Sequence, residues 1–137
     1  MDFTFSSTHL IRVRYGETDR MGYCYYGNYA QYLEIGRVEA MRKLGIVYKE
    51  LENEGLLLPV STLNIKYKYP AFYDDELTIQ TTIDQIVGAR IFFSYKVYCL
   101  EKLIVEAETI LVFVDKNTNK PILCPKLFWD KLKTYEK

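Results

Sequence analysis

The spacing of apolar residues along the chain changes from a helical period to a strand period. Between residues 28 and 44, apolar or small residues recur every three or four positions, and Gly45 follows at once. Residues three and four apart share a helix face and glycine often ends a helix, so this segment is predicted to be one long helix. Its buried stripe is expected to consist of Tyr29, Leu33, Gly36, Ala40 and Leu44. The charged residues expected elsewhere on its surface are Arg37, Glu39, Arg42 and Lys43.

After Gly55 the apolar residues alternate with polar ones, as they do in strands. The predicted strands are residues 8–15 before the helix and residues 63–69, 77–84, 91–100 and 104–115 after it. Short helices are expected at 47–53 and 126–135. One strand, a long helix and four strands without intervening helices predict an α+β fold, with a mainly antiparallel sheet and the helix on one face. The 137 residues suffice for a single domain spanning 1–137, and one helix cannot cover both faces of a long sheet, so oligomerisation is expected.

The amino-acid composition limits the kinds of partner and the cellular location expected for the protein. Eighteen basic residues balance eighteen acidic ones, which argues against nucleic acid as a partner. Three cysteines without C-x-x-C spacing favour a reducing compartment. The N-terminus does not resemble a signal peptide, and no apolar run reaches the roughly 18 residues of a membrane span. A cytoplasmic protein without a membrane segment is therefore expected. The thirteen tyrosines fit ligand clefts and ordinary packing equally well.

Elimination leaves carboxylate chemistry as the main catalytic option. The only histidine is His9, and no G-x-S-x-G, G-x-x-x-x-G-K-[ST] or G-x-G-x-x-G motif is present. A Ser-His-Asp triad, a zinc centre and nucleotide-dependent chemistry therefore lack support, and no metal or cofactor is expected. A nucleophilic Cys24 would need a nearby base to form its thiolate, and a small buried apolar residue is the favoured interpretation of this cysteine.

The segment between the first strand and the long helix carries the candidate chemistry. Asp19 lies in a loop with Gly22 and Gly27, which let the backbone turn or approach a ligand closely. A helix N-terminus presents unpaired N–H groups that suit a developing oxyanion, here the amides near Tyr26 and Gly27. Asp19 thus has two interpretations, as a catalytic carboxylate or, more commonly for such a residue, as a turn or capping residue.

The same segment, Y-G-E-T-D-R-M-G-Y-C-Y-Y-G-N-Y, resembles the signature of the 4-hydroxybenzoyl-CoA thioesterase branch of the hotdog superfamily. The similarity continues with Y-L-E-x-x-R at 32–37, L-G at 44–45 and Y-P-A-x-Y-D-D-x-L at 69–77. This resemblance implies a hotdog fold, in which a five-stranded antiparallel sheet wraps a long central helix. It also implies hydrolysis of acyl-CoA or acyl-carrier-protein thioesters, with the active site at the interface of a homodimer or of a homotetramer built as a dimer of dimers.

By position, the resemblance implies that Asp19 is the catalytic carboxylate and that the Tyr26 amide, beside Gly27, is the oxyanion donor. Many family members have histidine at the position of Tyr26. Phenols titrate near pH ~10 and are poor bases at neutral pH, so the side chain is not expected to act as the base. Whether Asp19 attacks the carbonyl or activates water is left open. Glu17 is expected to order the loop.

Candidate substrate-binding residues lie outside this core. Ser61 and Thr62, on the strand expected to cross the helix, are expected to contact the acyl group, and Asn28 is expected to bind substrate. A local basic patch of Lys66, Lys68, Arg90 and Lys96 is expected to hold the CoA phosphates, with Arg90 the favoured residue. For the basic residues, a solvated sheet face is the competing interpretation. Glu34 either faces the acyl pocket or, as we favour, pairs with Arg37 one turn away.

Two other functions compete with the thioesterase. A hotdog hydratase would pair a carboxylate with a histidine, and His9 fits no such motif. A non-catalytic acyl-thioester-binding or scaffold protein would keep the fold, and the intact loop around Asp19 counts against it.

Overall fold

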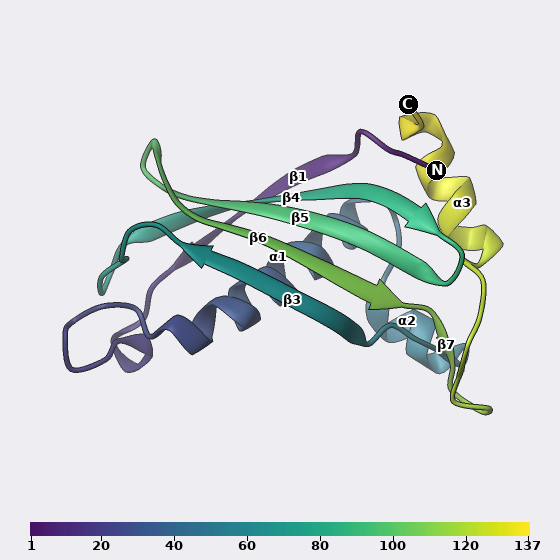
Figure 1. The fold of residues 1–137 in the computed structure, drawn as a ribbon, viewed down its shortest axis with the longest axis horizontal. Helices are drawn as coiled ribbons and strands as arrows, with labels where there is room; N and C mark the ends of the chain where they lie inside the picture. The colour runs from purple at the N-terminus through teal and green to yellow at the C-terminus, as the bar shows by residue number, and fades with distance from the viewer.

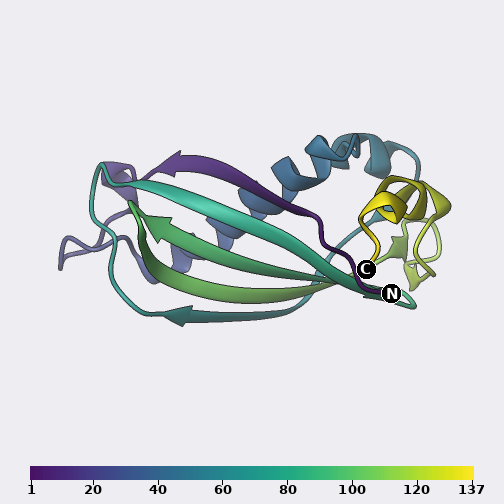
Figure 2. The ribbon, with the colours of Figure 1, turned by 90° about the horizontal axis from the view of Figure 1, so that it is seen from above.

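The computed structural model describes residues 1–137 and is built around a curved antiparallel sheet crossed by one long helix (Figures 1 and 2). The sheet strands are β1 (Ser6–Arg12), β3 (Val60–Tyr67), β4 (Glu76–Val87), β5 (Arg90–Cys99) and β6 (Lys102–Val112). Their order across the sheet is β1-β4-β5-β6-β3, so β1 and β3 form its edges. The helix α1 (Tyr29–Lys43) covers one face. This confirms the α+β class and the hotdog arrangement.

Smaller elements close one end of the molecule. They are α2 (Tyr48–Asn53), β2 (Leu56–Leu57), β7 (Val114–Asp115), β8 (Lys120–Pro121) and α3 (Lys126–Leu132). The three short strands form a second sheet in the order β2-β7-β8. Three 3-10 turns are η1 (Tyr15–Glu17), η2 (Tyr26–Asn28) and η3 (Lys133–Tyr135). The N- and C-termini lie close together at this end (Figure 1).

The predicted elements are present, and the first strand shows how their bounds differ. The strand predicted at 8–15 is β1 at 6–12, because residues 15–17 close a 3-10 turn. The terminal helix ends at Leu132 and continues as the turn η3. Gly45 adopts φ +83°, the left-handed conformation expected of a glycine that ends a helix. No helix is long and apolar enough to cross a membrane.

The predicted helix stripe packs against the sheet, and Gly36 sets the distance between them. All five stripe residues are buried. A Cβ atom at Gly36 would lie 2.7 Å from Thr81 Oγ1 and 2.8 Å from Ile79 Cγ2, both on β4. Such distances are shorter than van der Waals contact, so only glycine allows the helix to pack this closely. The close neighbour of α1 at this point is therefore β4.

Arg37 is predicted to lie outside the apolar stripe of the helix, but its side chain is buried with it. Only 8% of Arg37 is exposed, and its Nη1 atom donates a hydrogen bond to the Tyr95 hydroxyl on β5, 3.4 Å away. The long arginine stem lets the charged group reach inward from a helix position next to the apolar stripe. The helical period indicates where a Cα lies on the helix, but it does not reveal this reach.

The edge strand β3 is almost entirely exposed. One of its edges pairs with β6, and the other pairs with no strand of the chain. Large apolar side chains remain about half exposed along it, at Val60, Leu63 and Tyr67. A long open strand edge with exposed apolar residues is a ready template for another strand.

Replacing Gly36 with valine should destabilise the protein. The added side chain would push α1 away from Ile79 and Thr81, and overpacking of this kind costs roughly 1–3 kcal/mol. Chemical denaturation followed by circular dichroism measures the loss. The matched control is Gly16→Val, because a Cβ at Gly16 would meet nothing within 4 Å. Equal stability of the two variants would contradict the close packing at Gly36.

Candidate active site

Glu17 anchors the loop between β1 and α1. Its carboxylate accepts hydrogen bonds from the Arg14 amide at 2.8 Å, the Arg14 guanidinium at 3.0 Å and the Tyr32 hydroxyl on α1 at 2.8 Å. Its backbone carbonyl accepts from the Tyr25 amide at 2.8 Å and from Asn28 Nδ2 at 2.7 Å. Glu17 therefore orders the loop, as expected, and ties it to the helix start. Burial opposes ionisation, but the hydrogen bonds from Arg14 and Tyr32 outweigh it and lower the pKa of Glu17.

Asp19 lies at the turn of this loop with one carboxylate oxygen engaged. Its Oδ1 atom accepts hydrogen bonds from the amides of Met21 at 2.9 Å and Tyr23 at 3.2 Å. Its Oδ2 atom has no hydrogen-bond or ion-pair partner in the protein, and the side chain is partly exposed. Asp19 thus forms the turn that sequence reasoning allowed. Because these two hydrogen bonds orient the carboxylate, its Oδ2 atom is held in place without a partner of its own.

The start of α1 supplies unpaired amides near Asp19. Tyr26 and Gly27 belong to the turn η2, and neither amide donates a hydrogen bond within the chain. A Cβ at Gly27 would lie 2.6 Å from the ring of the exposed Tyr25, so a larger residue here would displace that ring. Free N–H groups and the partial positive charge of a helix start favour an anionic oxygen.

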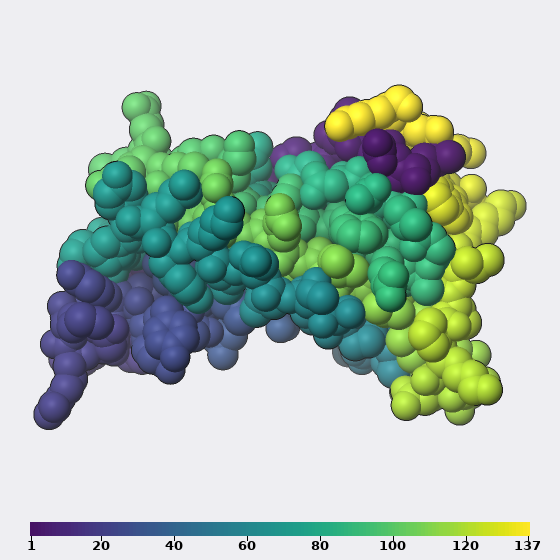
Figure 3. All heavy atoms as spheres, in the orientation of Figure 1, coloured from purple at the N-terminus to yellow at the C-terminus, as the bar shows by residue number.

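A cleft of about 260 Å³ is lined by both Asp19 and Tyr26. It is lined by Asp19, Met21, Tyr23, Cys24, Tyr26, Tyr29, Tyr67, Lys68, Tyr69 and Pro70. Its walls are largely aromatic: the Tyr29 and Tyr67 rings meet edge to face at 5.6 Å, and the Tyr67 hydroxyl donates to the Tyr26 carbonyl at 3.2 Å. In Figure 3 the Asp19 loop projects from the end of the molecule remote from the two termini. Asp19 and Tyr26, predicted to act together, do line one cleft.

Cys24 lies deep in this cleft in the thiol form. It is 5% exposed, and its Sγ atom lies 3.4 Å from the Tyr32 hydroxyl. Burial raises the pKa of the Cys24 thiol, so little thiolate forms at neutral pH. These observations favour the interpretation of Cys24 as a small buried residue. Cys99 and Cys124 are likewise free thiols.

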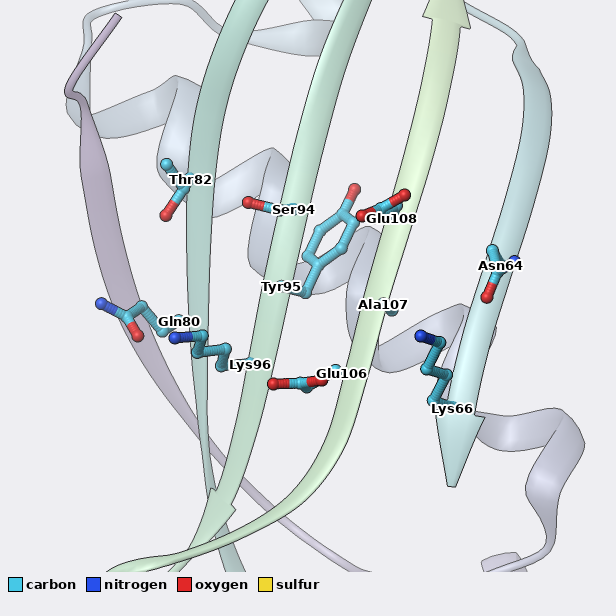
Figure 4. A pocket seen from close by; sticks show the side chains of 10 residues that line it. All are labelled: Asn64, Lys66, Gln80, Thr82, Ser94, Tyr95, Lys96, Glu106, Ala107 and Glu108. Carbon is cyan, nitrogen blue, oxygen red and sulfur yellow. The ribbon is translucent and has the colours of Figure 1, made fainter. Parts of the chain in front are cut away.

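The predicted basic residues lie in two places. Lys68 lines the cleft, with its Nζ atom 3.7 Å from Glu106 Oε2. Lys66 lies instead in a polar groove of about 450 Å³ on the face of the sheet turned away from α1, near Lys96 and Glu106 (Figure 4). Residues two apart in a strand point to the same sheet face, and Lys68, just after the end of β3, reaches Glu106 of that groove while it also lines the cleft.

The other residues predicted to contact substrate do not line the Asp19 cleft of their own chain. Ser61 and Thr62 lie near the start of β3, whereas Tyr67 at its end lines the cleft. At about 3.3 Å per residue, Ser61 and Tyr67 are separated by roughly 20 Å along the strand. Arg90 begins β5 at the opposite end of the sheet. Asn28 is close to the cleft, but its side-chain amide is engaged with the Glu17 carbonyl.

The expected ion pair between Glu34 and Arg37 is not formed. No Glu34 oxygen lies within 4.0 Å of an Arg37 nitrogen, because the guanidinium turns toward Tyr95 while Glu34 stays at the helix surface. His9 lies within β1, opposite Ile79, and does not line the cleft. No cluster of three or more histidine, cysteine or carboxylate residues is arranged to hold a metal ion.

The family of the chain follows from a match over most of its length. The model of the thioesterase-like superfamily matches residues 13–132. The chain belongs to the thioesterase-like superfamily. This membership confirms the resemblance found in the sequence and the expected enzyme class, a thioester hydrolase.

The chain is also similar to individual proteins and solved structures. The chain is 38% identical over 128 residues to a putative acyl-CoA thioesterase, YneP, of Bacillus subtilis, covering 93% of each chain. The structure of a DHNA-CoA thioesterase from Staphylococcus aureus is 33% identical and superimposes with a TM-score of 0.86, covering 91% of this chain and 85% of that one. A 4-hydroxybenzoyl-CoA thioesterase shares the fold with a TM-score of 0.84 at 22% identity, covering 93% and 99%.

Sequence reasoning missed the aromatic walls of this thioesterase-like cleft and one cation beside it. Four of the lining residues listed above are tyrosines apart from Tyr26, and the high tyrosine count was the available signal. The ammonium group of Lys102 lies 3.6 Å from the centre of the Tyr69 ring, a cation–π contact at the cleft rim. Lys102 is 33 positions from Tyr69, and no local pattern relates the two.

Replacing Glu17 with glutamine should lower the free energy of unfolding by roughly 1–3 kcal/mol at pH 7, because a neutral amide binds Arg14 less well and cannot accept at both atoms. The folded-state pKa of Glu17 lies below its ordinary value of 4.5. Its contribution is therefore complete above pH 4.5 and is lost as the pH falls through the folded-state pKa. Denaturant unfolding of both proteins between pH 7 and pH 3 measures the difference.

The control for this series is Glu52→Gln, which changes an exposed carboxylate on α2 without a hydrogen-bond partner. Its stability should follow that of the natural protein at every pH. A pH-independent deficit of the Glu17 variant would show that the ionised carboxylate is not what stabilises the loop.

Proposed function

We propose that this protein hydrolyses acyl-CoA thioesters to a free acid and CoA. The observation that carries the proposal is that Asp19 and Tyr26 line one cleft, and that the amides of Tyr26 and of the adjacent Gly27 are unpaired. Membership of the thioesterase-like superfamily and the relatives named above support the same reaction. The free cysteines fit the cytoplasmic location that we propose with it.

In the proposed mechanism, the amides of Tyr26 and Gly27 hold the thioester carbonyl oxygen. They polarise the carbonyl and stabilise the negative charge that develops on its oxygen; losing one such donor typically raises the barrier by about 3–4 kcal/mol. Asp19 Oδ2 then attacks the carbonyl carbon to form a mixed anhydride that water cleaves, or it takes a proton from a water that attacks. In both routes the carbon–sulfur bond breaks and CoA leaves as its thiolate.

Lys68 is proposed to bind the phosphates of CoA at the cleft, and Lys102 adds a second positive charge at its rim. The pantetheine arm would lie between the cleft and these lysines along the apolar surface of Tyr69. Lys66 faces the opposite side of the sheet, so in this proposal it does not contact the CoA bound by its own chain.

The site is proposed to be completed by a second copy of the chain paired along β3. Antiparallel pairing about the middle of β3 places the Val60 end of one copy beside the Tyr67 end of the other, as two-fold symmetry requires. Ser61, Thr62 and the more distant Arg90 lie at the Val60 end. These predicted contacts would then approach the Asp19 cleft of the second copy, which explains why one chain does not bring them together.

Replacing Asp19 with asparagine should lower turnover of an acyl-CoA panel by roughly 10²–10⁴-fold, the range typical for a lost catalytic acid or base. Asparagine keeps an oxygen that accepts from the Met21 and Tyr23 amides, so the loop is expected to hold its shape. Release of the CoA thiol, followed with Ellman's reagent, measures the rate.

Two comparisons accompany this measurement. Asp130→Asn alters an exposed carboxylate on α3 and should leave the rate unchanged, while Cys24→Ala separates carboxylate from thiolate catalysis. Full activity of the Asp19 variant, or a comparable loss with Cys24→Ala, would remove Asp19 from its role. Binding of acyl-CoA without any turnover by the natural protein would favour a non-catalytic acyl-thioester-binding protein.

Replacing Leu63 with glutamate should separate the copies. Leu63 is 46% exposed in the middle of β3, and a charge there would be buried at the proposed seam. Light scattering after size exclusion should give the mass of one 16.2 kDa chain, with kcat/KM reduced at least about tenfold because the site loses the second copy's contribution. Leu100→Glu, at an 89% exposed position in the β5–β6 turn, is the control. An active monomer would contradict the shared site.

A further inference from the structure

The Tyr67 hydroxyl makes a hydrogen bond that has no role in the mechanism proposed above. It donates to the backbone carbonyl of Tyr26 at 3.2 Å, across 41 positions of the chain. The same carbonyl accepts from the Tyr29 amide at the start of α1. Tyr67 is the last residue of β3, so the edge strand of the sheet holds the backbone of the turn η2 directly.

The carbonyl that Tyr67 holds belongs to the same peptide group as one of the unpaired amides. This peptide bond is trans and planar, so the Tyr26 carbonyl and the Gly27 N–H lie in one plane and point in opposite directions. Holding the carbonyl therefore fixes the direction of the Gly27 N–H, which has no partner in the chain. The other unpaired amide, that of Tyr26, lies on the preceding peptide group, whose Tyr25 carbonyl accepts from the Asn28 amide at 3.0 Å.

The glycine at position 27 explains why this peptide group needs a restraint. Gly27 has no Cβ, so rotation of the peptide group before it is less hindered than before a residue with a side chain. A rotating N–H would have to be reoriented as negative charge develops on the substrate, whereas a fixed donor needs little reorganisation. The Tyr29 amide restrains the carbonyl from within the helix. Because Tyr67 lies on a separate element, its hydroxyl also fixes the turn relative to the sheet.

The Tyr67 ring is held in place by contacts that do not involve its hydroxyl. It packs edge to face against the Tyr29 ring at 5.6 Å and the Tyr26 ring at 6.2 Å between ring centres. Its backbone pairs with Val105 on β6. Phenylalanine at this position would therefore keep the ring and lose only the donor. Partial burial raises the pKa of the Tyr67 phenol, so the hydroxyl keeps its proton and remains a donor at neutral pH.

We propose that Tyr67 is a positioning residue of the active site, whose hydroxyl holds the peptide group between Tyr26 and Gly27 so that the amides of η2 face the thioester oxygen. This inference rests on the proposed thioester hydrolysis and adds a residue that acts through the backbone and not on the substrate. A hydrogen bond to a peptide carbonyl also polarises the peptide group, which makes its N–H a stronger donor. Tyr67 therefore acts on both the direction and the strength of the oxyanion donor.

The test replaces Tyr67 with phenylalanine and measures turnover of acetyl-, hexanoyl-, palmitoyl- and benzoyl-CoA by release of the CoA thiol. For the acyl-CoA that the natural protein hydrolyses fastest, kcat should fall roughly 5- to 50-fold, less than the roughly 10²–10³-fold that loss of a whole oxyanion donor costs. KM should change by less than about twofold, because the ring that lines the cleft is kept and the hydroxyl acts only on the transition state.

Tyr48→Phe is the matched control. The Tyr48 hydroxyl likewise donates to a backbone carbonyl, that of Leu58 at 3.5 Å, but it lies on α2 and does not line the Asp19 cleft. Its loss should leave kcat and KM unchanged. Melting temperatures and light scattering verify that both variants fold and associate as the natural protein does.

Infrared spectroscopy tests the orientation of the amides directly. The same acyl-CoA, with an isotopic label at its carbonyl carbon, is bound to the Asp19→Asn variant, which should hydrolyse it slowly. Its carbonyl band should lie at lower frequency than that of the free thioester, because hydrogen bonds from the amides weaken the carbonyl bond. Adding Tyr67→Phe should move the band back toward the free value, and adding Tyr48→Phe should not move it. A general loss of stability would not produce this difference.

The outcomes separate the two proposals. If the natural protein hydrolyses no acyl-CoA, the proposed function fails and this inference fails with it. If acyl-CoA is hydrolysed but Tyr67→Phe leaves either kcat or the carbonyl band unchanged, the inference alone is overturned. A rise in KM at unchanged kcat would make Tyr67 a substrate contact and would overturn it as well. An equal fall in kcat with Tyr48→Phe would do the same, since the effect would then not be specific to the cleft.

Discussion

The close approach of α1 to β4 at Gly36 is the constraint on which the rest of the molecule depends. Any larger side chain there would collide with Ile79 and Thr81, and the helix would be lifted off the sheet. With α1 seated against the sheet, its first residues reach the end of β3 and form the cleft beside Tyr67. This packing buries the apolar stripe of the helix but leaves β3 uncovered. The position of one helix therefore determines both the cleft and the exposed strand edge.

Hydrogen bonding divides the polar groups of the loop into paired groups that hold its shape and unpaired groups. Glu17 and its carbonyl are saturated by partners on both sides of the loop, and Asp19 Oδ1 accepts two amides. Asp19 Oδ2 and the amides of Tyr26 and Gly27 have no partner. Groups engaged in the fold cannot also change partners during a reaction, whereas unpaired groups held rigidly nearby need little reorganisation to stabilise developing charge.

Two other unpaired features lie outside the cleft. The free edge of β3 lacks a strand partner, and the guanidinium of Arg37 lacks an acidic one. Each is unfavourable in an isolated chain, because backbone polar groups and buried charges both require partners. The two features are close together, because Val60 at the start of β3 and Arg37 line the same cavity.

The sequence by itself determined the helices and strands and the position of the candidate loop around Asp19. The 3.6-residue and two-residue periods are local, so α1, its buried stripe and the strands followed from them, and the loop motif placed Asp19 near the Tyr26 amide. Strand ends shifted where turns formed, as at residues 15–17. Only the tertiary structure decided that Arg37 turns inward, that Lys68 and not Lys66 lines the cleft, and that Arg90 lies at the far end of the sheet. These outcomes depend on strand order and side-chain direction, which arise from contacts between residues distant in the chain and leave no periodic trace within it.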